Sequence, residues 1–586
     1  MKKAIKYFTI LLVGISALLI SCSEDFLEIS PYGTLNESVL GNTDGLDGLL
    51  VAAYAELDGW AGWSAGPVWD AVGTNWLMAD VTSDDAYKGT DAGDQPPMNP
   101  VERNEHDPAS RVTYTNWQAW YDGIARSNDV IRVANVAEGL DANLKAQYIA
   151  EAQFLRAHYH FQLIRIFGPN IPYVDENAPS DGIVPNDREI WSDVEADFAA
   201  AAAALPASQT QVGKATSWAA KGLLARTHMY QGDYGAALPL LNEIINSGQF
   251  SMLDNFQDVH GTAGNNGPHS IFQIQHSVND GIPDGQAGNY GEVLNNPHNG
   301  AAGGGCCGFF QPSHNLVNAF KTENGLPVAN FNATDLGNDQ GCFANTPDCC
   351  TADADGNCTE PYEVDQHPVD PRLDFTVGRK GVPYLDWGIH SGIGYIRDQA
   401  YGGPFSPKKR IFKKAEQGSN SINGHSWGAN GATAINYNIL RYADVLLMAA
   451  EAEIETGNVA RGIELINQVR GRVKNNPDTW VKLPDGSDAA NYEIELYDTG
   501  LSQAEAREAL RFERRLEFAM EGHRLFDLNR WGITVQVMND YYAKESEPGK
   551  RAYLVGATFA PHRVLNPIPQ QAIDRSVGTL TQNPGY

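Results

Sequence analysis

The sequence has few cysteines and few basic residues for its length. Its 586 residues include 7 cysteines and 42 lysines and arginines, against 72 aspartates and glutamates, for a formal net charge of −30. Nucleic-acid phosphates require Lys and Arg partners, so this balance argues against a nucleic-acid-binding protein. After the first 20 residues no apolar run reaches membrane-spanning length, and the alanine run at 199–204 is much too short. We therefore expect the rest of the chain to fold outside the bilayer.

Local motifs of catalysis are also scarce. The sequence contains neither an HExxH zinc motif nor a GxxxxGK[ST] phosphate loop. The stretch GIGYIRD at 392–398 lacks the third glycine of a dinucleotide fingerprint. The two carboxylates of a glycosidase have no local signature, so a surface glycan hydrolase remains an alternative. We predict that the protein is not an enzyme and needs no cofactor.

The N-terminus has the features of an exported lipoprotein. Three lysines lie within the first six residues, and an almost unbroken apolar run follows at 7–20. The run ends in Leu-Ile-Ser-Cys, which resembles a bacterial lipobox, so residues 1–21 are the predicted signal peptide and Cys22 the predicted lipidated residue. An ordinary signal peptide is the alternative. The acidic stretch at 23–25 resembles the signal that sends lipoproteins to the outer leaflet of the outer membrane, although a periplasm-facing anchor also fits.

The other six cysteines fall within one glycine-rich region. An even number of cysteines in an exported protein favours disulfides, and their pairing stays open. Zinc is the alternative, but the spacing lacks paired CxxC motifs and no histidine lies among them. The disulfide candidates are Cys306, Cys307, Cys342, Cys349, Cys350 and Cys358.

Hydrophobic spacing predicts helices at both ends of the chain. Apolar residues recur every three or four positions in 117–136 and 142–167. Segments 216–247 and 438–472 have the small and aromatic packing positions of a tetratricopeptide-like helical hairpin. Between them the chain is rich in Gly, Asn and Pro and lacks long helical periodicity.

These patterns predict a mainly α protein. Antiparallel helix pairs form a tetratricopeptide-like scaffold, and a large, loop-rich, disulfide-containing insertion is supported on it. No linker divides the chain, so a single domain is predicted. Its expected bounds are 22–586 for the domain, about 35–255 and 436–586 for the scaffold, and about 256–435 for the insertion.

Several stretches resemble one protein family, in the order expected for it. ERRLEFAMEGHRLFDLNRWG at 513–532 resembles the C-terminal signature of the SusD/RagB family of nutrient-binding outer-membrane lipoproteins. The helix pair at 437–470, the stretch DPRLDFTVGRKG at 370–381, the segment CSEDFLEISP at 22–31 and the ending PIPQQAIDRSVGTLTQNPGY also agree. The resemblance implies a glycan-capturing protein that carries out no chemistry and partners a SusC-like TonB-dependent transporter. Peptide capture by the same architecture is the alternative.

The charged residues of the signature have a structural interpretation. They recur at helical spacing, where opposite charges three or four residues apart can pair. Networks of this kind fix the packing between helices. We therefore predict that the signature identifies the fold and does not mark a site. The residues are Glu513, Arg514, Glu517, Glu521, Arg524, Asp527 and Arg530.

A weaker pattern concerns calcium. Asp353, Asp355 and Asn357 alternate as do the first ligands of a calcium loop, but the twelfth position is Val364 in place of glutamate. A solvent-exposed turn is therefore favoured over a structural calcium site.

Aromatic residues in loops are the candidates for sugar binding. A pyranose packs its C–H face on an aromatic ring, while polar side chains receive its hydroxyls. In relatives of the implied family, such rings come from loops after the first helices and from the central insertion. The predicted aromatic contacts are Trp63, Tyr87, Tyr290 and Phe309, with Asp84, Asp85, Lys88 and Asn289 as polar partners. Further loop aromatics include Trp387, and a short basic run occupies 408–410.

Overall fold

The structure is a computed structural model. It describes residues 37–59, 67–179, 181–282, 287–298, 301–303, 306–333, 335–336, 364–422 and 431–586. Cys22 and the predicted signal peptide lie outside these ranges. Within them, no helix has both the length and the apolar character needed to cross a membrane.

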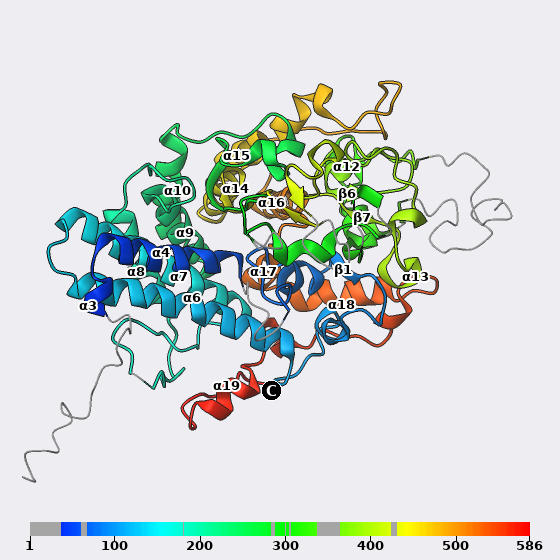
Figure 1. Cartoon of the computed structure of the whole chain (residues 1–586). Coiled ribbons are helices and arrows are strands. Elements are labelled where there is room, and N and C mark those ends of the chain that lie inside the picture. The colour runs from blue at the N-terminus through cyan, green and yellow to red at the C-terminus, as the bar shows by residue number, and fades with distance from the viewer. Residues whose placement is uncertain are drawn as a thin grey trace, which may run out of the picture.

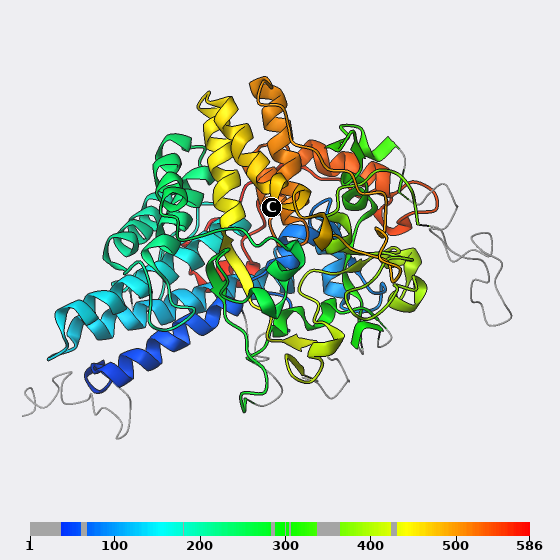
Figure 2. The same ribbon diagram turned by 90° about the horizontal axis from the view of Figure 1, so that it is seen from above.

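Antiparallel helices make up the scaffold, as predicted. Each helix from α6 to α10 packs on a helix next to it in the chain, α14 packs on α10 and α15, and both α14 and α15 contact α16. Figure 1 shows α3, α4 and α6 to α10 side by side, and Figure 2 shows the same helices from above. The bounds are α3 Glu37–Leu40, α4 Thr43–Ala55, α6 Arg111–Val136, α7 Ala142–Phe167, α8 Trp191–Ala204, α9 Ser217–Tyr230, α10 Tyr234–Asn246, α14 Tyr442–Glu455, α15 Val459–Lys474 and α16 Gln503–Phe518.

Helix α7 shows why these segments are helical. The carboxylate of Asp141 accepts hydrogen bonds from the first backbone N–H groups, and Gly168, with φ of 90°, ends the helix before a proline. The prediction for 142–167 is therefore confirmed at both ends. Helix α6 begins before the predicted start at position 117, because Val112 and Thr113 extend its buried face.

The predicted hairpin at 216–247 is confirmed as α9 and α10. Asp233 caps α10, and Gly232 turns the chain with φ of 71°. Gly222 lets α9 approach the strand before α14, because a Cβ there would lie 2.3 Å from Leu440 Cδ2.

The insertion is rich in loops, as predicted, and its strands are short. All five sheets are two-stranded and antiparallel in the part of the chain that the structure describes, with pairs β1–β3, β2–β10, β4–β5, β6–β7 and β8–β9. The strands are β1 Ala86–Gly89, β2 Ser270–Ile274, β3 Phe309–Pro312, β4 Thr322–Glu323, β5 Leu326–Pro327, β6 Val377–Gly378, β7 Ser406–Pro407, β8 Ser421–Ile422, β9 Ala432–Thr433 and β10 Tyr437–Arg441.

Two expectations about local structure are corrected. The second hairpin was expected to begin at 438, but 437–441 form β10, which pairs with β2 and ties the insertion to α14. The sequence VWDAVGTNWLMAD at 68–80 also predicts one helix, with Trp69 and Trp76 in the core. Only Trp76–Val81 is helical, as a π-helix, because Asn75 adopts a left-handed backbone with φ of 50°. Both tryptophans are buried, as predicted.

Short helices complete the chain, and the main hydrophobic core draws on both scaffold segments and the insertion. Helix α18 lies at the base of the insertion in Figure 1. The remaining bounds are α5 Asn99–Glu102, α11 His314–Ala319, α12 Leu373–Thr376, α13 Gln399–Gly402, α17 Arg524–Arg530, α18 Thr534–Glu545 and α19 Gln570–Arg575.

The charged signature residues form buried ion pairs, mostly with other elements and not along their own helix. Glu517, at the end of α16, accepts hydrogen bonds from Arg441 at 2.6 Å and from Arg472 at 2.6 Å. Glu513 accepts from Arg372 at 2.6 Å, and Arg372 belongs to the insertion. All five side chains are buried. The network therefore joins α16 to β10, α15 and the insertion.

A second set of ion pairs joins α16 and α17 to the scaffold. Arg514 pairs with Asp527 at 2.9 Å and with Asp444 of α14 at 2.8 Å. Arg530 donates to Glu451 of α14 and to Asp527. These contacts agree with the structural interpretation of the signature, since every charge has a protein partner.

Candidate ligand-binding site

A polar pocket lies within the insertion, and asparagines line much of it. Most of its walls come from the segment around the predicted contact Asn289 and from the basic run after β7. The described residues that line it are Asn289, Glu292, Asn295, Asn296, Phe310, Pro407, Lys409, Arg410, Ile411, Gly431 and Thr433.

The amides of the pocket are only partly satisfied. Asn289 Nδ2 donates to Glu292 Oε2 at 2.8 Å, and Asn296 Nδ2 donates to the Val293 carbonyl at 3.3 Å. The amide oxygens of Asn289 and Asn296 have no hydrogen-bond partner, nor does either amide atom of Asn295. Buried polar groups normally have partners, so these atoms are available to a ligand or to water.

An ion pair forms one wall of the pocket. Arg410 donates to both carboxylate oxygens of Glu292, at 2.6 and 2.7 Å, and to the Met520 carbonyl at 3.1 Å. Burial opposes ionisation of Glu292, but the charge and hydrogen bonds of Arg410 outweigh it, so the pKa of Glu292 lies below its usual range. The carboxylate is thus held as an anion already committed to a cation.

Backbone conformations that side-chain-bearing residues rarely adopt gather around the pocket. Phe310 and Arg410, which line it, have φ of 55° and 61°, and Met520, whose carbonyl contacts Arg410, has φ of 64°. Leu385 and Ala302, with φ of 51° and 46°, belong to the adjoining turn and loop. Such strain persists only where the surrounding structure enforces it, and it is enriched at functional sites.

Trp387 presents a half-buried indole next to this pocket. It belongs to an apolar cluster with Ile411, which lines the pocket. The indole Nε1 donates to the Phe412 carbonyl at 2.9 Å, and the two rings pack edge to face at 5.6 Å. Gly303 permits this packing, because a Cβ there would lie 2.8 Å from the indole. The ring is therefore fixed in orientation and partly exposed.

The described ends of several loops meet here. Gly59 forms a β-bridge with Val72, and a Cβ on Gly291 would lie 2.4 Å from a Val72 methyl group. The backbone of Asn289 donates to the Thr433 carbonyl at 2.9 Å. The predicted contact Trp63 lies outside the described residues, in the segment 60–66 that follows Gly59.

Tyr87 and Phe309, two of the predicted aromatic contacts, are interior residues of the β1–β3 pair. The Tyr87 hydroxyl donates to Glu545 Oε2 at 2.5 Å and lies 3.0 Å from His314 Nδ1. Phe309 packs edge to face on Trp76 at 6.4 Å. Both rings are 0% exposed, so neither offers a face to a ligand, and the expectation of ligand contact is replaced by a structural role. Tyr290 is buried at 5% exposure beside the pocket.

The predicted polar partners Asp84 and Asp85 are also interior residues. Asp84 pairs with Arg524 at 2.7 Å and Asp85 with Arg515 at 2.8 Å. Burial opposes ionisation of Asp84, but the charges of Arg515 and Arg524 outweigh it and lower its pKa to about 2. The polar loop sequence suggested solvation, whereas these carboxylates anchor β1 to α16 and α17. We do not include them in the proposed site.

Lys88 has a similar structural role. Its Nζ donates to the carbonyls of Asp91 and Asp94 at 2.9 and 2.7 Å and to Asn99 Oδ1 at 2.7 Å. The ammonium lies 5.0 Å from the centre of the Tyr401 ring. Burial lowers the pKa of Lys88 to about 8. With its donors engaged inside the protein, Lys88 does not offer a charge to a ligand.

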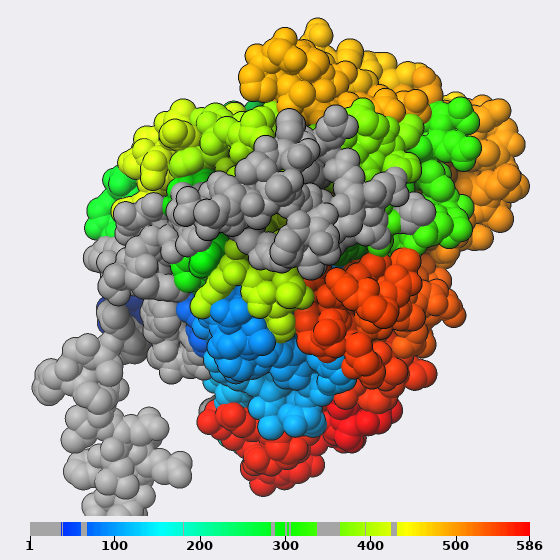
Figure 3. Space-filling view, turned by 90° about the vertical axis from the view of Figure 1, so that its right-hand side faces the viewer, coloured from blue at the N-terminus to red at the C-terminus, as the bar shows by residue number. Residues whose placement is uncertain are grey.

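The basic run at 408–410 is buried and is not a surface patch. Lys408 donates to the Pro383 carbonyl at 2.8 Å, and Lys409 pairs with Glu521 at 2.6 Å. Figure 3 shows how the chain segments meet on one face of the molecule. The yellow-green part of the insertion lies above the blue residues near position 100, and the orange-red α18 region lies beside those residues.

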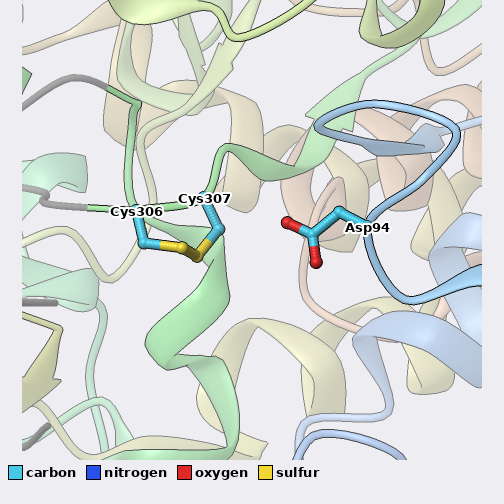
Figure 4. Close-up of side chains that lie close together, drawn as sticks. All are labelled: Asp94, Cys306 and Cys307. Atoms are coloured by element: carbon cyan, nitrogen blue, oxygen red, sulfur yellow. A yellow bond between two sulfur atoms is a disulfide. The ribbon is translucent and has the colours of Figure 1, made fainter. Parts of the chain in front are cut away.

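Two of the disulfide candidates, the adjacent Cys306 and Cys307, lie among the described residues. Cys306 and Cys307 are bonded to each other, and Asp94 faces them from the loop after β1 (Figure 4). Asp94 Oδ2 accepts hydrogen bonds from Arg397 at 2.6 Å and Thr90 at 3.2 Å, so its charge is already paired. The other disulfide candidates (Cys342, Cys349, Cys350 and Cys358) and the calcium candidates (Asp353, Asp355 and Asn357) lie outside the described residues.

Sequence reasoning missed several features of this region. Asn295 and Asn296 carry no motif, and only asparagine enrichment in a loop could have suggested them. The pentapeptide GHSWG at 424–428 matches the GxSxG pattern of a nucleophile elbow. It lies outside the described residues, between the strands β8 and β9, which pair antiparallel with each other.

Comparison with known protein families identifies the family to which the chain belongs. The SusD family model matches residues 268–586, more than half of the chain. A second model, described as starch-binding associating with outer membrane, matches residues 25–229. The fold defines a helical scaffold protein, and the chain belongs to the SusD family, as its signature predicted.

Individual relatives agree over most of their length. A SusD-like protein, P25, from Formosa agariphila is 24% identical over 78% of this chain and 76% of its own. Among solved structures, surface glycan-binding protein A from Bacteroides fluxus has a TM-score of 0.65 at 23% identity, covering 93% of this chain and all of its own. The Bacteroides thetaiotaomicron protein of the same name, in complex with laminarihexaose, has a TM-score of 0.62 at 23% identity, covering 92% and 99%.

Proposed function

We propose that this chain captures an oligo- or polysaccharide at the cell surface and delivers it to a SusC-like TonB-dependent transporter. The observation that carries the proposal is the half-buried indole of Trp387 beside a pocket of buried, unpartnered amides. Aromatic faces next to convergent polar groups are the general requirement of a sugar site. Trp63 remains a proposed further contact on the basis of its loop sequence.

The family comparisons support the same proposal. Solved relatives of similar fold include a laminarin-binding SusD-like protein and a glycan-binding protein in complex with laminarihexaose. The second family model associates its members with the outer membrane. Together with the lipobox ending at Cys22, this supports a lipid-anchored protein in the outer membrane that faces the cell exterior.

The described lining of the pocket supports binding rather than hydrolysis. A glycosidase requires two carboxylates across the scissile bond. Glu292 is the single carboxylate among the described lining residues, and both of its oxygens accept hydrogen bonds from Arg410. A carboxylate neutralised in this way is a poor general acid or nucleophile.

Affinity electrophoresis tests the proposal. The mature chain carrying Cys22→Ser would run through gels that contain neutral or acidic polysaccharides. Retardation by a glycan, without release of reducing ends, is the expected result. Release of reducing ends would replace capture by hydrolysis. Lack of retardation by any glycan, with peptides co-purifying from the native outer membrane, would replace it by peptide capture.

Delivery to a transporter is tested separately. The full-length lipidated chain, purified gently from outer membranes, is expected to bring a TonB-dependent barrel protein with it. Disrupting the gene for that barrel should abolish uptake of the captured glycan without affecting retardation in the gel. Uptake that persists without the barrel would contradict delivery and leave capture intact.

A further inference from the structure

Among the unpaired hydrogen-bonding atoms of the asparagine-lined pocket, acceptors outnumber donors. Three are acceptors, the Oδ1 atoms of Asn289, Asn295 and Asn296, and one is a donor, the Nδ2 of Asn295. The three side chains are 2%, 5% and 4% exposed, so bulk water does not satisfy them freely. A ligand that enters must therefore bring mainly donors.

The orientation of the amides is fixed by their neighbours. Glu292 is a carboxylate and can only accept, so Asn289 must turn its NH₂ group toward it and its oxygen away. The carbonyl of Val293 fixes Asn296 in the same way. Exchanging the positions of Oδ1 and Nδ2 of Asn295 would not change the number of unpaired acceptors and donors, because both of its amide atoms are unpaired. The excess of acceptors is thus a property of the pocket and not of an arbitrary amide assignment.

We infer that the ligand of this pocket is an uncharged glycan bound through its hydroxyl groups, in preference to a sulfated or carboxylated one. This inference rests on the proposed function and names its substrate class. Each sugar hydroxyl donates one hydrogen bond, so several hydroxyls together can supply the donors that the three amide oxygens need, and a hydroxyl oxygen can accept from Asn295 Nδ2. A sulfate or ionised carboxylate only accepts, so it would face the amide oxygens without a proton between them.

The cations at the pocket do not reverse this preference. Arg410 is committed to Glu292 through two hydrogen bonds, and Lys409 is bonded to Glu521 at 2.6 Å. An anionic ligand could recruit Arg410 only by leaving the buried carboxylate of Glu292 without its cation, which is strongly unfavourable. It could recruit Lys409 only by taking a buried donor from Glu521, which Arg441 also pairs. No other lysine or arginine is among the described lining residues. The chain's net charge of −30 also repels polyanions at long range.

Matched glycan pairs that differ only in charge test the inference. The mature chain carrying Cys22→Ser would be run on gels that contain one member of each matched pair, laminarin or sulfated laminarin and dextran or dextran sulfate. Further gels would contain the neutral glycans galactomannan and arabinoxylan or the acidic glycans polygalacturonate and alginate. Retardation by a neutral glycan and not by an acidic glycan or sulfated derivative is expected. Asn295→Leu, which removes both unpaired atoms at similar volume, should weaken that binding about tenfold. The control Asn186→Leu removes a buried amide bonded to the Asn170 and Thr581 carbonyls, away from the pocket, and should not weaken it.

Each contrary result points to a different failure. Retardation by acidic glycans alone would overturn the neutral-ligand inference and leave glycan capture standing. Neutral binding that Asn295→Leu does not weaken, in a variant whose melting curve stays cooperative, would show that the amides bind only water. Retardation by no polysaccharide of the panel would overturn the proposed capture itself.

Discussion

Glu517 Oε1 accepts a hydrogen bond from Arg441 Nη1 at 2.6 Å, in a part of the core where both side chains are at most 3% exposed. Glu517 lies near the end of α16 and Arg441 ends β10, so this pair fastens the C-terminal signature to the strand that joins insertion and scaffold. Burial opposes ionisation of Glu517, but Arg472, Arg441 and Arg372 outweigh it, and its pKa lies far below the usual range.

Removing this carboxylate should destabilise the protein strongly. Glu517→Ala leaves three buried guanidinium groups short of a partner, and we expect a loss of about 3–5 kcal/mol in the free energy of unfolding. Denaturant unfolding measures it. The control Arg461→Ala removes an exposed pair with Glu464 and should change stability by less than about 1 kcal/mol. Equal effects of the two variants would contradict the structural role of the network.

The stability of the protein should depend on pH through His106. Burial lowers the pKa of His106 to about 4, from an ordinary value of 6.5. Between these values the unfolded chain binds the proton that the folded chain excludes. The free energy of unfolding therefore falls as pH is lowered from about 6.5 to about 4, by roughly 3 kcal/mol for this group.

The variant His106→Gln isolates that contribution. It loses the contact with Asn566, so it should be less stable than the parent chain above about pH 7 by a constant amount. Toward pH 4 the difference should shrink. Unfolding curves measured every half unit give the comparison, and parallel pH profiles of the two proteins would contradict the assignment.

Tyr87→Phe should weaken the fold and leave ligand binding unchanged. The variant removes the hydroxyl that donates to Glu545 and leaves a buried carboxylate with one partner fewer, for an expected loss of about 1.5–3 kcal/mol. Glycan retardation measured well below the melting temperature should match the parent chain. Weaker retardation in a fully folded variant would restore Tyr87 as a ligand contact.

Trp387→Ala should weaken glycan binding about tenfold, because it removes the half-buried indole on which a sugar ring is proposed to pack. Isothermal titration with the glycan found by electrophoresis measures the change. The control is Trp218→Ala on α9, a half-buried indole with Lys221 over its ring at 4.9 Å. Unchanged affinity in Trp387→Ala, or an equal loss in Trp218→Ala, would count against the proposed platform.

The bond between Cys306 and Cys307 should be detectable by mass spectrometry. Without reductant, a proteolytic peptide that contains both cysteines should be lighter than its reduced form by two hydrogens and should resist alkylation. Reduction should then allow two alkyl groups to attach. Alkylation before reduction would show free thiols, and linkage to a peptide containing 342 or 358 would show a different pairing.

The sequence by itself determined the helical scaffold, because periodicity and capping act over a few residues. The spacing in 142–167, the Asp141 cap and the following Gly168 fixed α7 at both ends. The stretch at 513–532 likewise identified the family, and its evenly spaced charges indicated an ion-pair network.

Only the tertiary structure decided which polar and aromatic side chains are accessible. Asp84 and Tyr87 lie in a polar loop sequence, yet each is buried, because its partners Arg524 and Glu545 come from elsewhere in the fold. Burial depends on contacts between residues far apart in the chain, which local pattern does not encode. For the same physical reason, the sequence pattern did not distinguish Trp387 from the other loop aromatics. Its position beside the asparagine-lined pocket follows from the tertiary structure.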